Sequence, residues 1–323
     1  MVEMKSISYL QAVTEAQREE MLANPDVVIM GEDLALYESD PSYLQGANNK
    51  QVWHTPISEC GFTGMGVGAA MAGLRPIVNL TIASFVYLAS DPIINQAGKL
   101  HYMTGGQIKI PAVFRAFYLH QGSNAAQHSD RPHPMFMAQP GLKIIAPSTP
   151  SDMKGLLKTA IRDDDPVLLF EDAVLWAKKG DVPDTDEHLI PLGVADIKRP
   201  GTDVTIVTIS SCLYHGLKAA EKLEKEGISA EVIDPRTLAP LDFDTILESV
   251  AKTGRLVVVD NANRTLSAAS EIAANVSENG FDSLKKPIQR VTTPDVHIPF
   301  SPALEEQFYP NADKIVAAVK RII

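Results

Sequence analysis

One carboxylate stands out in this sequence because almost no other polar side chain surrounds it. Glu59 opens the run of residues 59–72, which consists mainly of glycine, alanine and apolar residues. A carboxyl group in such surroundings is partly desolvated, and desolvation favours its neutral, proton-sharing form. The small residues let a helix, a second subunit or a flat ligand approach the backbone closely. Glu59 is therefore either an acid–base group or the first residue of a tightly packed helix, where a carboxylate suits the helix dipole.

A long polar loop is the second place where chemistry is expected. Residues 118–134 hold three of the eight histidines of the chain. Loops of this length in compact α/β domains are more often functional than not. The histidine spacings match no compact zinc pattern, and no cysteine lies near them in sequence. His128 is thus a candidate for acid–base or hydrogen-bonding work, with incidental surface histidines as the alternative.

Motifs that bind phosphate groups are missing from the sequence. Gly64, Gly66 and Gly68 lack the spacing of a dinucleotide fingerprint, and there is neither a Walker-type loop nor a Gly-x-Ser-x-Gly motif. If the protein uses a phosphorylated cofactor, we expect another chain to bind its phosphate end.

Alternating strands and helices must position these residues. In the first half, short apolar runs predict strands at 27–30, 77–80, 112–117, 143–146 and 167–170, and helical patterns occur at about 9–22, 64–72, 91–103 and 151–161. Near-continuous apolar strands between helices predict a parallel sheet covered on both faces. Ligands bind beyond the C-terminal ends of such strands, so Glu32, Asp33, Asn79 and the histidine loop are expected along one edge.

The second half repeats this pattern after a polar segment. Strands are predicted at 204–209, 229–234, 256–260 and 288–291, and helices at 212–226, 243–252, 267–277 and 312–322. We therefore predict an α/β protein with two domains in series, each a mostly parallel sheet with helices on both faces. Residues 1–180 form the first predicted domain, 181–195 the linker, and 196–323 the second domain.

Charge and cysteine content exclude several classes of protein. The 323 residues carry a formal net charge of −11, which argues against a nucleic acid or an anionic membrane as the main partner. The two cysteines, Cys60 and Cys212, lie far apart and fit a reducing compartment. The N-terminal residues show no signal or transit pattern, and no apolar run is long enough to span a bilayer. We expect a cytoplasmic protein, or a mitochondrial matrix protein whose transit peptide has been removed.

Several motifs together resemble one enzyme family over nearly the whole chain. They lie at residues 55–59, 67–76, 95–99, 102–107, 126–129, 140–143, 147–157, 160–167, 231–242 and 252–255. These motifs are similar to those of the β subunit of the decarboxylating component of 2-oxo acid dehydrogenase complexes. The pyruvate, branched-chain and acetoin types of this component all belong to the transketolase-like superfamily, with a pyrimidine-binding domain and a transketolase C-terminal-like domain.

The resemblance implies a cofactor and a partner chain. Thiamine diphosphate would bind between an α and a β subunit of an α2β2 assembly, and the α subunit would hold the diphosphate and its magnesium ion. Glu59 corresponds to the glutamate that shares a proton with the aminopyrimidine ring, for which its carboxyl must stay near neutrality. Phe85 corresponds to an aromatic residue that packs on this ring. The cofactor would act as the electron sink for decarboxylation of a small 2-oxo acid.

The resemblance also assigns a histidine and a metal site. His128 corresponds to the histidine that assists reductive acyl transfer to the lipoyl group of the acyltransferase core. Ala112, Ala160, Asp163 and Asp165 correspond to a potassium site formed largely by backbone carbonyl oxygens, which are hard ligands suited to an alkali ion. A capped turn between a helix and a strand is the alternative for these residues.

Some positions differ from the family pattern. Asn79 stands where a glutamate is common, Pro92 and Asp130 each replace a glutamine, and residues 116–120 replace a glycine-containing turn. These differences gather around the expected approach of substrate and cofactor, so they leave the identity of the 2-oxo acid open.

Two other functions stay open beside the dehydrogenase. A split transketolase-like enzyme would use the same cofactor to transfer a ketol unit without lipoate. A non-catalytic paralogue would stabilise or regulate an α subunit, although the presence of both Glu59 and His128 argues against it.

Overall fold

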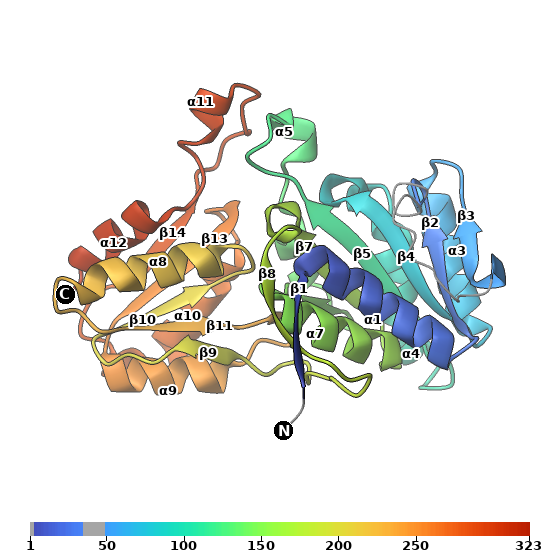
Figure 1. The fold of residues 1–323 in the computed structure, drawn as a ribbon, viewed down its shortest axis with the longest axis horizontal. Coiled ribbons are helices and arrows are strands. Elements are labelled where there is room, and N and C mark those ends of the chain that lie inside the picture. The colour runs from blue at the N-terminus through green and yellow to red at the C-terminus, as the bar shows by residue number, and fades with distance from the viewer. Residues whose placement is uncertain (1–2, 35–48) are drawn as a thin grey trace. The chain divides into compact units, whose positions relative to one another are not determined.

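The chain crosses three times between two structural units. The structure, a computed structural model, describes residues 3–34 and 49–323. Met1–Leu119 and Met135–Leu192 form the first unit, and His120–Pro134 and Gly193–Ile323 form the second. The predicted α/β class with two domains in series is confirmed, because each unit has a mostly parallel sheet that carries helices (Figure 1).

The first unit is built around parallel strands in the order β6-β7-β5-β4-β2-β3. Their bounds are β2 (Val27–Gly31), β3 (Val52–His54), β4 (Arg75–Ile82), β5 (Val113–Tyr118), β6 (Lys143–Ile145) and β7 (Val167–Asp172). The residues of β2, β5 and β7 are buried throughout, as their continuous apolar sequences predict. Gly31 lets β2 approach β4, because a Cβ there would stand 2.2 Å from the carbonyl oxygen of Asn79.

Two helices of the first unit, α1 (Tyr9–Ala23) and α7 (Pro150–Arg162), begin at residues whose side chains cap them. The unit also has α3 (Glu59–Met71) and α4 (Gly98–Met103), with short turns η1 (Asn49–Gln51), η2 (Ala83–Tyr87), η3 (Pro92–Ala97) and η4 (Ala173–Leu175). Ser8 and Gln11 form a capping box at the start of α1, and Thr149 caps α7. Helices α1 and α7 lie side by side (Figure 1), where the Lys154 and Lys158 ammonium groups contact the Glu19 carboxylate at 2.7 and 2.5 Å.

The second unit has a sheet with the strand order β14-β13-β10-β11-β9, in which only β9 is antiparallel to its neighbour. The strands of this sheet are β9 (Asp196–Arg199), β10 (Val204–Thr208), β11 (Ala230–Asp234), β13 (Leu256–Asn263) and β14 (Gln289–Thr293), and the short strand β12 (Thr237–Ala239) is not part of it. The helices are α5 (Ala125–His128), α8 (Cys212–Glu224), α9 (Phe243–Thr253), α10 (Ala268–Asn279), η5 (Phe281–Ser283), α11 (Pro302–Glu305) and α12 (Ala312–Lys320). Helix α8 packs against α12 over an apolar core, and α9 packs against α10.

The observed division of the chain differs from the predicted domains at two places. The predicted linker begins within β8 (Lys179–Pro183), which pairs with β1 (Met4–Ser8) in an antiparallel ribbon of the first unit. The histidine-bearing segment 120–134 belongs to the second unit, and α6 (His133–Met137) leads the chain back to the first. Among the described residues, the helices are all too short or too polar to cross a membrane.

Candidate active site

Glu59 occupies the first position of α3, as expected for an acidic residue at a helix N-terminus. Its side chain is buried, with 6% of the residue exposed, so the predicted dry setting is present. Gly66 brings α3 close to β4, because a Cβ on this glycine would stand 2.5 Å from Cγ2 of Val78. The small residues of the run therefore do allow a close approach of backbone to a neighbouring element.

A second buried carboxyl, Glu32, feels the negative charge of Glu59. Glu32 follows the C-terminal end of β2 and is 2% exposed. Its Oε1 accepts a hydrogen bond from Thr81 Oγ1 at 3.3 Å, and its Oε2 has no hydrogen-bond partner among the described residues. Burial, and then the charge of Glu59, raise the pKa of Glu32 to about 7, although the Thr81 hydrogen bond opposes this. This pair therefore contains a carboxyl that gains or loses a proton near neutral pH.

Sequence reasoning placed Glu32 at the edge of the sheet but gave it no role. The signal that could have marked it is its position directly after a fully buried strand, where parallel sheets bind ligands. Its electrostatic coupling to Glu59 depends on how α3 packs on the sheet, and that packing is not visible in the sequence.

Two buried polar atoms at α3 and after β2 have the chemistry of partners for a ring with donors and acceptors. Thr63 is fully buried, and its hydroxyl has no hydrogen-bond partner among the described residues, like Oε2 of Glu32. Buried polar groups of this kind require partners, which an aminopyrimidine ring provides. Phe85 lies in η2, directly after β4, and is half-buried. Glu59 and Phe85, the two residues expected to contact the ring, thus belong to the same unit.

Asn79, which departs from the family pattern, takes part in a buried polar cluster. Arg115 and Glu171 are fully buried and form an ion pair of 2.5 Å between Nη2 and Oε1. Arg115 Nη1 donates to Oδ1 of Asn79 at 3.4 Å. Burial raises the pKa of Glu171, against the lowering influence of the Arg115 charge. Asn79 thus binds the arginine without adding a third charge to this cluster.

His128 is the last residue of α5 and lies in the loop that belongs to the second unit. Two side chains of that unit, Glu305 and Tyr309, contact the loop. The Glu305 carboxylate accepts hydrogen bonds from the backbone N–H groups of Gln121 and Ser123, at 2.8 and 3.0 Å. The Tyr309 ring lies 4.9 Å from the His120 ring and 5.8 Å from the Arg131 guanidinium.

The end of the loop is held as firmly as its beginning. His133 Nε2 lies 3.5 Å from Oδ2 of Asp260, and both residues are buried. Arg131 Nη1 donates to the carbonyl oxygens of Ser129 and Asp130. The loop therefore has a defined conformation, which a group that transfers a proton requires.

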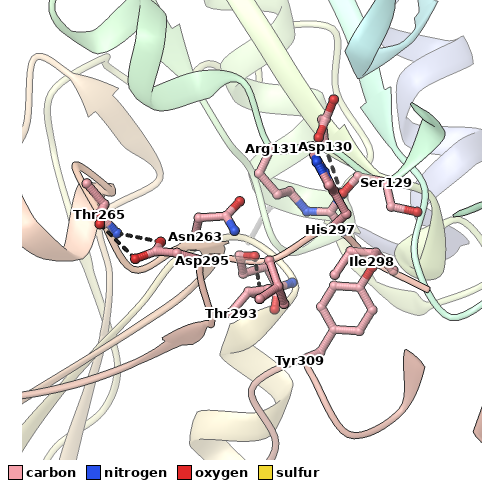
Figure 2. A pocket seen from close by; sticks show the side chains of 12 residues that line it. Ser129, Asp130, Arg131, Asn263, Thr265, Thr293, Asp295, His297, Ile298 and Tyr309 are labelled. Atoms are coloured by element: carbon pink, nitrogen blue, oxygen red, sulfur yellow. Dashed lines mark hydrogen bonds between the residues drawn. The ribbon is translucent and has the colours of Figure 1, made fainter. Parts of the chain in front are cut away.

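A pocket of about 440 Å³ lies next to His128 in sequence and within the second unit (Figure 2). Ser129, Asp130 and Arg131 contribute to the lining, and the other lining residues are Asn261, Asn263, Thr265, Thr293, residues 295–298 and Tyr309. Figure 2 shows Asp295 bound to Thr265, whose backbone N–H and hydroxyl both donate to the carboxylate. Burial raises the pKa of Asp130, and His297 and Arg131 oppose this. The pocket combines cationic, acidic and hydroxyl groups, so it suits a polar ligand.

Three residues of the expected potassium site, Ala160, Asp163 and Asp165, lie at the end of α7 and in the turn after it, and Ala112 directly precedes β5. Oδ1 and Oδ2 of Asp163 accept hydrogen bonds from Lys143 Nζ, which also contacts Asp165 at 3.0 Å. The carbonyl oxygen of Asp163 accepts from Arg75, and that of Ala112 accepts from Val167 N–H. Side-chain cations already neutralise these carboxylates, so only the remaining lone pairs of the backbone carbonyl oxygens are suited to potassium. The potassium site stays a prediction.

No group of three or more histidine, cysteine, aspartate or glutamate side chains in residues 3–34 and 49–323 has an arrangement that could hold a metal ion. The two cysteines stay apart, with Cys60 exposed and Cys212 buried.

Comparison with protein families gives two matches that cover most of the chain. Residues 5–175 match the family described as the transketolase pyrimidine-binding domain. Residues 193–315 match the transketolase C-terminal domain. Residues 176–192 lie between the two matches, and the first unit of the structure ends at the last of them, Leu192.

Curated relatives are similar over nearly the full length of this chain. The acetoin:2,6-dichlorophenolindophenol oxidoreductase β subunit of Bacillus subtilis is 42% identical, with 98% of this chain and 97% of that protein covered. The 2-oxoisovalerate dehydrogenase β subunit of the same organism is 40% identical, with 99% of each chain covered. The pyruvate dehydrogenase E1 β subunit of Rhizobium meliloti is 43% identical, with 99% of this chain and 70% of that protein covered.

Among solved structures, an inactive β4 tetramer of a split-gene transketolase has the same fold. Its TM-score is 0.80 at 24% sequence identity, and 98% of each chain is covered. At this level of identity the likeness concerns the fold alone.

Proposed function

This chain belongs to the family of 2-oxo acid dehydrogenase E1 β subunits, which have the transketolase pyrimidine-binding and C-terminal domains, and we propose that it supplies the β half of a thiamine-diphosphate-dependent active site. The observation that carries the proposal is the buried pair of carboxyls, Glu59 and Glu32, at the start of α3 and the end of β2. In water both groups would be ionised at neutral pH, whereas here one of them titrates near 7.

Glu59 holds and exchanges a proton with the ring nitrogen of the bound cofactor. A carboxyl does this best when water is excluded, and the burial of Glu59 provides that condition beside a second buried carboxyl, Glu32. Phe85 supplies an apolar surface against which the ring packs, and the Thr63 hydroxyl offers a further hydrogen bond. Bound thiamine diphosphate supplies the electron sink for decarboxylation of the 2-oxo acid.

A partner α subunit completes the site by binding the diphosphate and its magnesium ion. The proposal is supported by the exposed face of α3, where a Cβ on Gly64 or Gly68 would have no atom within 4 Å. Apolar side chains are exposed near this face, including Ile57 at 79% and Met65 at 43%. Exposed apolar surface beside small residues is typical of a face that another chain covers closely.

His128 assists the transfer of the acyl group to the lipoyl group of an acyltransferase core. The loop that presents it is fixed at Gln121 and Ser123 by Glu305, so the ring has a defined place from which to move a proton. The polar pocket that begins at Ser129 provides room for a substrate group next to this histidine.

The decisive experiment is co-expression with the α subunit of the same organism. The purified pair is assayed with pyruvate, branched-chain 2-oxo acids and acetoin, with 2,6-dichlorophenolindophenol as electron acceptor, and then with a lipoyl domain. We expect turnover from the pair and none from this chain alone. Full activity of the lone chain would contradict the proposed division of the site. Ketol transfer between sugar phosphates, without dye reduction, would instead establish the transketolase-like alternative.

A further inference from the structure

The second unit contains another pocket, whose charge is opposite to that of the chain. Its volume is about 320 Å³, and it is lined from the end of β13, from β14 and from α12. Four lining side chains are cationic, namely Arg264, Arg290, Lys314 and Arg321, and none of the lining residues is acidic. Since the whole chain has a net charge of −11, this concentration of positive charge is local.

Neutral oxygen atoms, and no carboxylates, hold the two half-buried cations of this pocket. Arg290 Nη1 donates to the carbonyl oxygen of Arg264 at 3.1 Å and to the Ser270 hydroxyl at 2.5 Å. Lys314 Nζ donates to the carbonyl oxygens of Gln307 and Tyr309, at 2.5 and 2.8 Å. These bonds fix the direction of each side chain but leave its charge uncompensated.

The surroundings of the four cations contain little negative charge. Burial lowers the pKa of Lys314, and no carboxylate acts to raise it. Asp295 feels the charge of Arg264, but its carboxylate is occupied by the Thr265 backbone N–H and hydroxyl. Among the described residues no ion pair involves any of the four cations. Like charges brought together in this way repel one another until an anion binds between them.

We propose that this pocket is a binding site for a small polyanion, a molecule with two or more phosphate or carboxylate groups. Guanidinium groups bind such groups through two parallel hydrogen bonds, and the anchored Arg290 loses little conformational freedom when it does so. The volume lies at the small end of ligand pockets, which favours a compact molecule over an extended acidic segment of a protein.

This site is separate from the proposed dehydrogenase chemistry. None of its residues is among those assigned to cofactor or acyl transfer, so the two proposals fail or succeed independently. Binding at this site is measured on the purified full chain without turnover.

The test uses the two exposed cations, because their replacement spares the core. The double variant Arg264→Gln/Arg321→Gln is compared with the natural chain for binding of inorganic pyrophosphate and of citrate, by calorimetry and thermal shift at low salt. Two charge-assisted contacts are removed, so we expect Kd to rise by about tenfold or more. Added salt should weaken binding to the natural chain as well.

A neighbouring residue gives the matched control. Lys320 lies on the same helix as the pocket residues, is exposed, and pairs with Glu226 outside the pocket. Lys320→Gln removes one positive charge outside the pocket, against two in the double variant, and should leave Kd within about twofold. Equal weakening by both variants would reduce the effect to overall charge and overturn the site. No binding of either anion by the natural chain would overturn it too, as would binding of oligoglutamate without binding of either small anion.

Discussion

At the scale of single residues, the first unit keeps two glutamates out of water and close enough for their charges to interact. Glu32 has the raised pKa of the pair because burial and Glu59 both disfavour its ionised form. Glu32 can therefore carry a proton near neutral pH in the same buried region as Glu59. Glu32 and Glu59 can each be replaced separately, so that the contribution of each carboxyl can be measured.

Replacement of Glu59 tests the proton exchange directly. In the assembled enzyme, Glu59→Gln keeps the shape of the side chain but removes its ability to take up and release a proton. We expect kcat for decarboxylation to fall by about 10²- to 10⁴-fold, the range of general acid–base catalysis. The exposed Glu278→Gln on α10 is the control and should keep normal turnover. Normal turnover of Glu59→Gln itself would refute the role of this residue.

Glu32 should make stability depend on pH. Its carboxyl has a higher pKa in the folded chain than in the unfolded chain, so the folded state binds more protons between about pH 4.5 and 7. The contribution to stability is therefore present at low pH and is lost as pH rises through this window. Glu32→Gln removes this loss. In urea unfolding, the free energy of unfolding of the variant minus that of the natural chain should be about 1 kcal/mol larger at pH 8 than at pH 5. A pH-independent difference between the two chains would contradict the raised pKa.

At the scale of elements, burial decided what the sequence could predict. The strands β2, β4 and β7 were predictable because apolar side chains fill both faces of a covered parallel sheet. The short strands β1, β8 and β9 escaped prediction because polar residues alternate with few apolar ones in them, so that backbone pairing defines them. The burial of Glu59 could be predicted from the small and apolar residues next to it in sequence. Its interaction with Glu32 could not, because it depends on how α3 packs on the sheet.

The placement of the histidine loop could not be predicted at all from local sequence. Glu305 binds Gln121 across 184 positions of the chain, and no local pattern encodes a contact of that separation. The loop follows β5 of the first unit in sequence, which suggested that it belonged there. A buried carboxylate that accepts two backbone hydrogen bonds is strong enough to fix it in the second unit.

Glu305 should therefore control the loop that carries His128. In Glu305→Gln, one of the two carboxylate oxygens becomes an NH2 group. This group cannot accept a hydrogen bond from the backbone N–H of Gln121 or Ser123, so one of the two bonds is lost. We expect faster hydrogen exchange in residues 120–124 and a drop of about tenfold in acyl transfer to a lipoyl domain. The adjacent exposed residue offers Glu306→Gln as a control that should change neither. Exchange that is unaltered in Glu305→Gln would show that other contacts fix the loop.

At the scale of the whole molecule, the two faces of α3 are expected to respond differently to added bulk. Gly66→Ala places a Cβ against Val78 and should destabilise the isolated chain by about 1–3 kcal/mol. Gly64→Ala meets no atom and should stabilise it by about 0.5–1 kcal/mol through helix propensity. Thermal unfolding of the lone chains measures both effects.

Assembly should disfavour Gly64→Ala, the variant that stabilises the lone chain. If a partner covers the exposed face of α3, Gly64→Ala should weaken association with the α subunit although the chain itself is more stable. Size-exclusion chromatography of the co-expressed chains gives the readout. Normal assembly of Gly64→Ala would move the interface elsewhere.

The three crossings of the chain between its units also limit how such genes can exchange parts. A crossover at the passage from Leu192 to Gly193 would join one ancestor's first half to another's second half. The recombinant would then combine residues 120–134 of one lineage with the Glu305 and Tyr309 of the other, although these form one unit. Such a recombinant keeps the conformation of the loop only if both parent genes encode the residues that hold it. Changes in residues 120–134 and in the residues that contact them are therefore constrained together.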